Sequence, residues 1–312
     1  MTNVSTRPLG HSGIKASVVG LGCNNFGRRL DQAQTTAVLD AAIDAGVTFL
    51  DTADSYGQTL SETYMGAALK GRRDQVVLAT KFGRPVNDDS YPSSPRGARE
   101  YIHHALESSL RRLQTDYIDL YYYHFPDGQT PMLETLEALD GVVKAGKARA
   151  IAASNLSAAQ IQEADDIARE HGLTRFTAIQ NEYSLLVREA EAEVLPLCAS
   201  LDIAFIPFFP LASGLLTGKY QRDVQAPAGT RLAERDQVAT DEQWRTVEAL
   251  TGYAQDRGVT LTDVAIGALL AAPAVASVIA GATKPEQIAA NAAAAQWTPS
   301  AADLAALSAI LD

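Results

Sequence analysis

Cysteine is scarce in this sequence, and its scarcity excludes two kinds of architecture. The chain has 312 residues but only two cysteines, Cys23 and Cys198. Two cysteines cannot form the disulfide framework of a small secreted domain, and no C-x-x-C pair is present to build a structural zinc site. We therefore expect no metal site. We interpret Cys23 as a small buried residue without a redox role.

Positive charge is also in short supply. Lysine and arginine together number 26 against 37 acidic residues, which gives a formal net charge of −11. A surface that binds nucleic acid needs clustered lysine and arginine, so nucleic acid is not an expected partner. The content of 46% hydrophobic and 20% charged residues is ordinary for a globular protein and argues against disorder.

Long apolar runs are missing as well. The longest apolar region, residues 264–282, is interrupted by Pro273 and consists largely of alanine. We interpret it as a buried helix followed by a strand, not as a membrane span. Residues 1–7 lack the apolar stretch of a secretory signal. The expectation is therefore a protein that does not associate with membranes and that is located in the cytoplasm.

The common nucleotide-binding and hydrolase motifs are absent too. Gly20-Leu21-Gly22 begins like a dinucleotide fingerprint, but Asn25 stands where the third glycine belongs. The sequence has neither a Walker A loop nor the G-x-S-x-G turn of a hydrolase. These absences disfavour a Rossmann fold and exclude a hydrolase of that type.

The sequence does contain a regular alternation of short apolar runs and amphipathic stretches. The apolar runs predict strands at residues 18–21, 47–50, 76–80, 117–123, 148–153, 176–179, 203–206 and 275–280. The amphipathic stretches predict helices at residues 32–45, 60–69, 98–113, 132–145, 158–170, 189–200, 242–257, 261–271 and 285–294. Two polar segments, 83–97 and 221–239, are predicted to be loops.

This alternation predicts an α/β fold with parallel strands joined by crossover helices. Eight such units in one chain of this length predict a (β/α)8 TIM barrel. Residues 7–17 predict an N-terminal β-hairpin that closes the bottom of the barrel, and residues 300–311 predict an extra C-terminal helix. Because no repeat or linker is visible, we expect residues 1–312 to form a single domain.

Reactive side chains follow several of the predicted strands. Asp51, Lys81 and His124 each come directly after one, and Tyr56 lies five residues beyond Asp51. In a barrel these positions converge at the carboxyl-terminal mouth, where barrel enzymes keep their active sites. An aspartate after a strand is often only a helix cap, and a lone lysine or tyrosine is usually solvated. The complete set is harder to explain in that way and favours an active site.

The four side chains suit one kind of chemistry. Lys81 beside Asp51 would stay charged, and a nearby cation would lower the pKa of Tyr56 from about 10. Tyr56 could then exchange a proton near neutral pH while His124 holds the same substrate oxygen. Reduction of a carbonyl group needs a proton donor and a group that holds the carbonyl oxygen in place. Since no side chain supplies a hydride, a nicotinamide cofactor is implied.

The segments around these residues resemble the aldo-keto reductase family of (β/α)8-barrel oxidoreductases, which use NADPH. The resemblance runs from about residue 7 to residue 291 and is closest to the broad bacterial branch of the family. It rests on nine segments in order: residues 20–22, FLDTADSYG at 49–57, ATKFG at 79–83, 116–120, HFPD at 124–127, 154–156, QNEY at 180–183, 210–211 and LTGK at 216–219.

The resemblance implies an NAD(P)H-dependent oxidoreductase that reduces aldehydes and ketones to alcohols in a reversible reaction. It implies a catalytic tetrad in which Tyr56 is the general acid, Lys81 and Asp51 tune it, and His124 orients the carbonyl. It also implies cofactor contacts that hold the nicotinamide amide, stack on its ring, cover the pyrophosphate and bind the adenosine. These contacts are Gly22, Ser154, Asn155, Gln180, Phe208, Pro210, Leu211, Gly214, Lys219, Gly281, Thr283, Lys284, Gln287 and Asn291.

The chain departs from the family pattern where many members bind the ribose 2′-phosphate. Gly281 and Gln287 stand where those members have a lysine and an arginine. Glutamine lacks the charge and the guanidinium fork of arginine, so binding of the 2′-phosphate is expected to be weaker. Thr283 and Lys284 could replace these contacts in part. The sequence therefore favours NADP(H) and leaves NAD(H) open.

Two other functions are compatible with parts of this pattern. A cofactor-binding regulatory subunit with little catalytic activity, of the kind found with potassium channels, shares the barrel and the tetrad. A barrel enzyme of phosphate metabolism would instead use Lys81 to form a Schiff base. The sequence fixes neither the substrate, beyond a small-molecule carbonyl compound, nor the oligomeric state.

Two further patterns have structural interpretations. We expect the three tyrosines at 121–123 to alternate between the two faces of a strand and to pack the barrel. We interpret the arginine pairs Arg72-Arg73 and Arg111-Arg112 as solvated charges at helix ends.

Overall fold

A computed structural model describes the whole chain except residues 1–3, 225–226, 228–231 and 234–238. Eight parallel strands form one sheet in the order β10-β3-β4-β5-β6-β7-β8-β9. Their bounds are β3 Val19–Gly22, β4 Phe49–Asp51, β5 Val77–Phe82, β6 Ile118–Tyr123, β7 Ala148–Ser154, β8 Ala178–Gln180, β9 Ala204–Phe205 and β10 Val278–Gly281.

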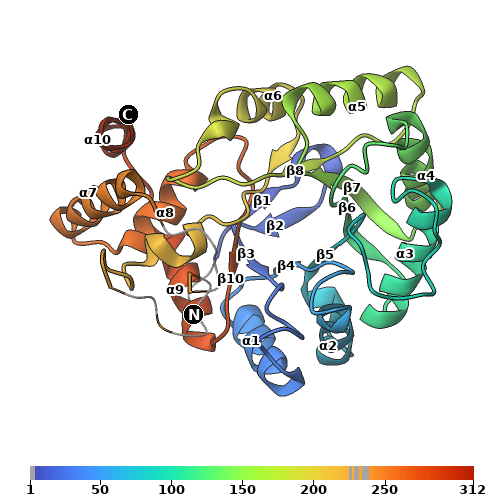
Figure 1. The fold of residues 1–312 in the computed structure, drawn as a ribbon, viewed down its shortest axis with the longest axis horizontal. Helices are drawn as coiled ribbons and strands as arrows, with labels where there is room; N and C mark the ends of the chain where they lie inside the picture. Colours follow the sequence, from blue (N-terminus) through green and yellow to red (C-terminus); the bar gives the residue numbers. More distant parts are fainter. Residues whose placement is uncertain (1–3, 225–226, 228–231, 234–238) are drawn as a thin grey trace.

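The two ends of this sheet meet. Phe205 in β9 forms an isolated parallel bridge with Val275, and its N–H donates to the carbonyl of Ala274 at 2.7 Å. The N–H of Ile279 in β10 donates to the carbonyl of Pro207 at 3.2 Å. The sheet therefore curls into a barrel with helices around it (Figure 1), and the predicted (β/α)8 fold is confirmed.

Several helices begin where the sequence offers a side-chain cap. Capping boxes open α1, α5, α7, α8 and α10, for example with Asp31 and Gln34 at the start of α1. The helices are α1 Gln32–Asp44, α2 Leu60–Ala68, α3 Arg99–Leu113, α4 Met132–Lys144, α5 Ala158–Glu170, α6 Val194–Ser200, α7 Asp241–Arg257, α8 Leu261–Leu270, α9 Pro285–Ala294 and α10 Ala301–Leu311. Short 3-10 turns are η1 Gly10–Ser12, η2 Arg73–Gln75, η3 Glu189–Glu191 and η4 Ala212–Thr217.

One predicted helix is confirmed only in its second half. Residues 189–200 form η3 and then α6, with a break at Glu193, where φ is −133°. Pro196 explains the break, because proline has no N–H and clashes with the carbonyl four residues earlier, so it is tolerated only in the first turn of α6. Helices α7 and α8 both lie between β9 and β10, as predicted for residues 242–257 and 261–271. The predicted loop at 221–239 lies partly outside the described residues.

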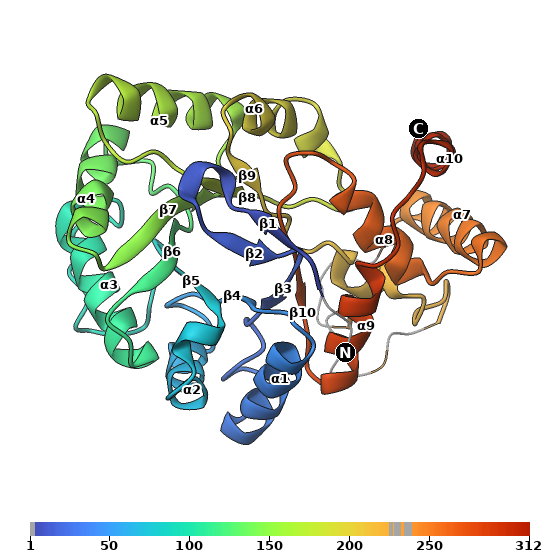
Figure 2. The ribbon, with the colours of Figure 1, turned by 180° about the vertical axis from the view of Figure 1, so that it is seen from behind.

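A hairpin lies across the amino-terminal end of the barrel. β1 Thr6–Pro8 pairs antiparallel with β2 Lys15–Ser17, and Figure 2 shows the hairpin in front of the barrel. Gly10 has a φ of +52° and approaches the barrel so closely that a Cβ there would lie 2.5 Å from the carbonyl oxygen of Thr177. Only glycine accommodates both conditions. At the other end of the chain, α10 lies on the outside beside α7 (Figure 1).

Two buried clusters separate the inside of the barrel from its outside. The inner cluster includes Phe49, Leu120 and Tyr122 together with hairpin residues, and the larger outer cluster lies between the sheet and the helices. Tyr121 and Tyr123 belong to the outer cluster while Tyr122 belongs to the inner one, so the predicted alternation is confirmed.

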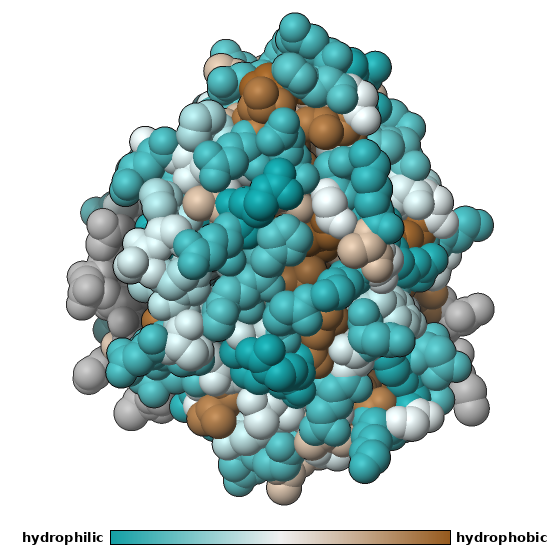
Figure 3. Space-filling model, turned by 90° about the vertical axis from the view of Figure 1, so that its right-hand side faces the viewer, coloured by the Kyte–Doolittle hydropathy of each residue, from teal (hydrophilic) through white to brown (hydrophobic). Residues whose placement is uncertain are grey.

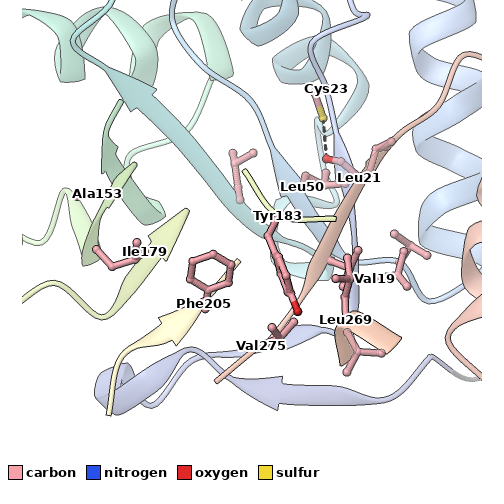
Figure 4. Packing of buried hydrophobic residues seen from close by; sticks show 14 of the residues in the cluster. Val19, Leu21, Cys23, Leu50, Ala153, Ile179, Tyr183, Phe205, Leu269 and Val275 are labelled. Carbon is pink, nitrogen blue, oxygen red and sulfur yellow. Dashed lines mark hydrogen bonds between the residues drawn. The ribbon is translucent and has the colours of Figure 1, made fainter. Parts of the chain in front are cut away.

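Cys23 is fully buried near this packing. Figure 4 shows its Sγ donating to the carbonyl of Leu21, at 3.4 Å. Burial raises the pKa of the Cys23 thiol well above its ordinary value, so the reactive thiolate is disfavoured. The interpretation of Cys23 as a small buried residue is consistent with this environment.

The prediction of solvated arginine pairs is wrong for two of their members. Arg112 donates from Nε to Oε2 of the buried Glu62 at 2.7 Å. Arg73 donates to Oδ2 of the buried Asp119 at 2.8 Å and stacks on the Tyr117 ring. A buried carboxylate requires such a partner, and the sequence alone did not show which carboxylates are buried.

The surface over α3 and α4 is mostly hydrophilic, with small hydrophobic spots between polar side chains (Figure 3). Among the described residues, no helix combines the length and the apolar character needed to cross a membrane.

Candidate functional site

Strand alternation brings the predicted site residues to one end of the barrel interior. Side chains along a strand alternate between two faces, so residues two positions apart point the same way. Each of five site residues follows a residue of the inner cluster by two positions. They are Asp51 after Phe49, Lys81 after Ala79, His124 after Tyr122, Ser154 after Ala152 and Gln180 after Ala178.

The sequence placed four of these residues just after the predicted strands, but in the structure they lie within strands. Lys81 is inside β5, and Asp51, Ser154 and Gln180 are the last residues of β4, β7 and β8. The apolar runs stop earlier than the backbone pairing does, because the final inward position of each strand carries a polar side chain. This difference moves the four residues into the rigid sheet.

Lys81 and Asp51 form a buried ion pair at the centre of the site. Lys81 Nζ donates to Asp51 Oδ2 at 2.6 Å and to the carbonyl of Thr52 at 2.9 Å. The Lys81 side chain is fully buried. Burial by itself lowers the pKa of Lys81, but Asp51 and then Tyr56 outweigh it, so the pKa is raised and the amine stays charged.

A Schiff-base role for Lys81 has little support from this environment. A lysine that attacks a carbonyl must be neutral and accessible, which requires a lowered pKa. Lys81 instead has a raised pKa and is engaged by two oxygen acceptors.

Tyr56 lies on the loop between β4 and α2, next to this pair. Lys81 Nζ is 5.1 Å from the centre of the Tyr56 ring, and the His124 ring meets the Tyr56 ring edge-on at a centroid distance of 5.8 Å. The loop turns at Gly57, whose φ is +57° and where a Cβ would lie 2.4 Å from the carbonyl oxygen of Phe26. This close approach requires glycine and fixes the position of Tyr56.

The expected direction of the Tyr56 pKa shift is wrong. Burial raises the pKa of Tyr56 above its ordinary value, and the nearby Lys81 cation lowers it by less. The cation acts in the predicted direction, but the loss of solvent outweighs it. The Tyr56 hydroxyl consequently keeps its proton at neutral pH, which makes it available as a proton donor.

His124 is buried and electrically neutral. Burial first, and then the charges of Lys81 and Arg84, hold the pKa of His124 well below its usual range. Its carbonyl accepts a hydrogen bond from Asn155 Nδ2 at 3.0 Å, which fixes the backbone. A neutral imidazole has one N–H, so His124 can donate a hydrogen bond to a substrate oxygen.

Three predicted cofactor residues are bonded to each other and to the charged pair. Ser154 Oγ donates to the carbonyl of Gln180 at 2.6 Å, and Asn155 Nδ2 donates to Ser154 Oγ at 3.0 Å. Gln180 Nε2 donates to Asp51 Oδ1 at 3.0 Å. The residues predicted to hold the nicotinamide amide and those predicted to be catalytic therefore form one network.

A strained loop follows β9. Phe209, Ala212 and Ser213 have φ values of +54°, +45° and +59°, and Gly214 has a φ of +99°. The buried Ser213 Oγ has no hydrogen-bond partner among the described residues. Phe208 at the start of the loop is half-buried, and Lys219 beyond its end is exposed. Pro210 is buried and Leu211 half-buried. The sequence did not single out Ser213, since left-handed backbone at a non-glycine residue leaves no clear signal in composition.

The remaining predicted cofactor residues lie around the end of β10 and the start of α9. Gly22 and Gly281 are partners in the register of β3 and β10. The N–H of Thr283 donates to Gln287 Oε1 at 2.7 Å, so Gln287 already bonds the chain at the start of α9. Lys284 is exposed and Asn291 is buried.

Asp54 is a residue of this region that the sequence analysis missed. It lies between Asp51 and Tyr56, is fully buried, and has no side-chain partner among the described residues for either carboxyl oxygen. Burial, with a further contribution from Glu62, raises the pKa of Asp54 well above its ordinary value. Burial therefore favours the protonated, uncharged form of this carboxyl in the folded protein.

This protonation gives Asp54→Asn a characteristic pH dependence. Wild-type stability should fall relative to the variant as the pH rises above 3.8, the ordinary aspartate pKa, because only the unfolded state then loses the proton. Urea unfolding at several pH values measures the difference. Asp256→Asn makes the same substitution on the exposed face of α7 and is the control. A pH-independent difference for Asp54→Asn would show that Asp54 is ionised when folded.

The fold and site define a barrel with a buried lysine–aspartate pair beside a tyrosine and a histidine, and the comparisons with known proteins agree. The profile described as "Aldo/keto reductase family" matches residues 18–312. The chain is 34% identical to "Aldo-keto reductase YhdN" of Bacillus subtilis (strain 168), over 97% of this chain and 92% of that protein. It is 38% identical to a "Probable voltage-gated potassium channel subunit beta" of Oryza sativa subsp. japonica, over 91% and 88% of the two chains.

A solved structure is also similar. The holo form of aldo-keto reductase AKR11C1 from Bacillus halodurans has a TM-score of 0.84 and 30% identity, covering 99% of this chain and 96% of that one. The chain therefore belongs to the aldo/keto reductase family. It is, accordingly, a nicotinamide-dependent oxidoreductase by family.

Proposed function

We propose that this protein reduces the carbonyl group of aldehydes and ketones to an alcohol, and that it catalyses the reverse reaction as well. The observation that carries the proposal is the buried Lys81–Asp51 pair beside Tyr56 and His124. We also propose that residues 1–312 act as one domain.

The residues at the mouth fit a nicotinamide cofactor. Ser154, Asn155 and Gln180 offer hydroxyl and amide groups for its carboxamide, and the half-buried Phe208 offers a flat ring for stacking. Buried Ser213 Oγ, which has no partner among the described residues, lies in the loop proposed to cover the pyrophosphate. When bound, the reduced nicotinamide supplies the hydride that no side chain can provide.

Tyr56 is the proposed general acid. Its hydroxyl is protonated at neutral pH and would give its proton to the carbonyl oxygen. The charge of Lys81 stabilises the phenolate that remains, and Asp51 keeps Lys81 charged and in place. His124, neutral and fixed by Asn155, donates a second hydrogen bond to the same oxygen. In the reverse direction the Tyr56 phenolate accepts the proton of the alcohol.

We propose NADPH as the preferred cofactor, held weakly at its 2′-phosphate. Lys284 is exposed at the start of α9, but Gln287 carries no charge and its oxygen bonds Thr283. An arginine at 287 would add a charge-assisted bond, worth about 1.5–3 kcal/mol.

Gln287→Arg is therefore expected to tighten NADPH binding by roughly tenfold or more and to leave NADH binding nearly unchanged. Titrations of both cofactors, followed by quenching of intrinsic fluorescence, measure the effect. Gln255→Arg on the exposed part of α7 makes the same change in charge away from the site and serves as the control. Equal tightening of both cofactors by Gln287→Arg would contradict a 2′-phosphate contact.

The test of the proposed function combines binding with turnover. The wild-type protein should bind reduced cofactor and consume it when reactive aldehydes are added, seen as a loss of near-ultraviolet absorbance. Binding without turnover of any aldehyde would favour a second candidate, a regulatory subunit that binds the cofactor. The similarity to the potassium channel beta subunit of Oryza sativa is the observation that keeps this candidate in view.

A further inference from the structure

Arg84 occupies a distinctive position at the mouth of the barrel. It follows β5 by two residues, and its side chain is exposed. Its guanidinium lies 4.8 Å from the centre of the Phe125 ring, and that ring is 5.2 Å from the ring of His124. The backbone of Arg84 is fixed as well, because its carbonyl accepts a hydrogen bond from the Tyr101 hydroxyl at 3.2 Å. The Phe125 ring therefore lies between the positive charge of Arg84 and the ring of His124.

No described carboxylate neutralises the charge of Arg84. Among the described residues, Arg84 has no ion pair, whereas arginines such as Arg73, Arg112 and Arg149 each pair with a carboxylate. Asp127, an acidic residue of the neighbouring loop, accepts hydrogen bonds from Gly97 N at 2.7 Å and from Thr130 Oγ1 at 2.8 Å. The Asp127 carboxylate is therefore engaged by hydrogen bonds from nearby loop residues and forms no ion pair with Arg84.

The field of Arg84 reaches the reacting groups. Its charge contributes to the low pKa of His124, after burial and Lys81, and it also opposes the rise in the pKa of Tyr56. An anionic group bound near Arg84 would consequently lie close to Tyr56 and His124, where the carbonyl must be placed.

The proposed cofactor residues leave Arg84 without a role in cofactor binding. Those residues lie on β3, on β7 and β8, and on the segments that follow β9 and β10. Arg84 instead follows β5, which lies between β4 and β6 in the sheet. In a chain with a net charge of −11, a cation that pairs with no carboxylate among the described residues remains available to a ligand on this side of the site.

We propose that Arg84 selects carbonyl substrates that also carry a carboxylate or a similar anionic group; this inference rests on the function proposed above. The guanidinium presents N–H groups in a planar fork that matches a carboxylate, and such charge-assisted bonds are stronger than neutral ones. The Phe125 ring supports the guanidinium and provides an apolar wall beside it. Arg84 thus binds and orients the substrate without taking part in proton transfer.

The test compares two aldehydes that differ in charge, para-carboxybenzaldehyde and its neutral methyl ester. The wild type should have a higher kcat/KM for the carboxylate, and this preference should weaken at high salt. Arg84→Gln should lower kcat/KM for the carboxylate by about tenfold, mainly through KM, and change the value for the ester by less than about twofold. Arg84→Lys should retain part of the preference, since it keeps the charge without the fork.

Arg245→Gln removes one positive charge from the exposed face of α7 and is the matched control, with no expected change in either value. An equal loss for both aldehydes in Arg84→Gln would overturn the inference, because it would indicate a structural role. An unchanged carboxylate preference would overturn it too. If the wild type turns over neither aldehyde, the proposed function itself fails and the inference falls with it.

Discussion

Replacing Tyr56 by phenylalanine is expected to lower kcat for aldehyde reduction by about 10²-fold or more, while the protein stays folded and still binds cofactor. The loss equals the contribution of a well-placed general acid. The ring of phenylalanine keeps the edge-on contact with His124, at 5.8 Å in the wild type, so only the hydroxyl is removed. Steady-state kinetics and a cofactor titration on the same preparation measure kcat and cofactor binding separately.

Tyr253→Phe is the matched control for this variant. Its hydroxyl donates to Asp303 Oδ1 at 2.7 Å on the outside of the protein, so the same atom is removed away from the site. Its turnover should equal that of the wild type. Near wild-type turnover in Tyr56→Phe would contradict the assignment of Tyr56 as the acid, whatever the control shows.

The second large effect concerns the buried Lys81–Asp51 pair. Removal of one partner leaves the other charge buried, which typically costs about 3–5 kcal/mol. We expect costs of this order in the free energy of unfolding for Lys81→Met and for Asp51→Asn. The double variant has no buried charge left at this point, so it should recover much of the loss.

Urea unfolding of the wild type, both single variants and the double variant gives the coupling energy. Reductase activity should be low in all three variants, which separates the stability of the pair from its role in the reaction. If the costs of the two single variants simply add in the double variant, the ion pair contributes no coupling and the account of the site centre is wrong.

The motif residues of the site could be predicted from sequence because they sit at a fixed place in a regular pattern. Asp51, Lys81 and Gln180 occupy the last inward position of their strands, two residues after Phe49, Ala79 and Ala178. A period of two locates such positions once the strands are found. The same regularity predicted the barrel.

Properties that depend on burial could not be predicted. The pKa of Tyr56 is raised where the sequence suggested that Lys81 would lower it, because the loss of solvent has no signature in residue order. Arg112 was taken as solvated, yet it bonds the buried Glu62 from a distant part of the chain. Asp54 was overlooked for the same reason, since its burial follows from the packing of several elements.

The most direct test of the central claim follows a label from the cofactor to the product. The wild type would be incubated with a reactive aldehyde and NADPH that carries deuterium on the ring carbon that donates the hydride. The account predicts an alcohol with deuterium on the former carbonyl carbon, and at most a trace of it from Tyr56→Phe. Cofactor binding by the wild type without any deuterated alcohol, across a panel of aldehydes, would contradict the account.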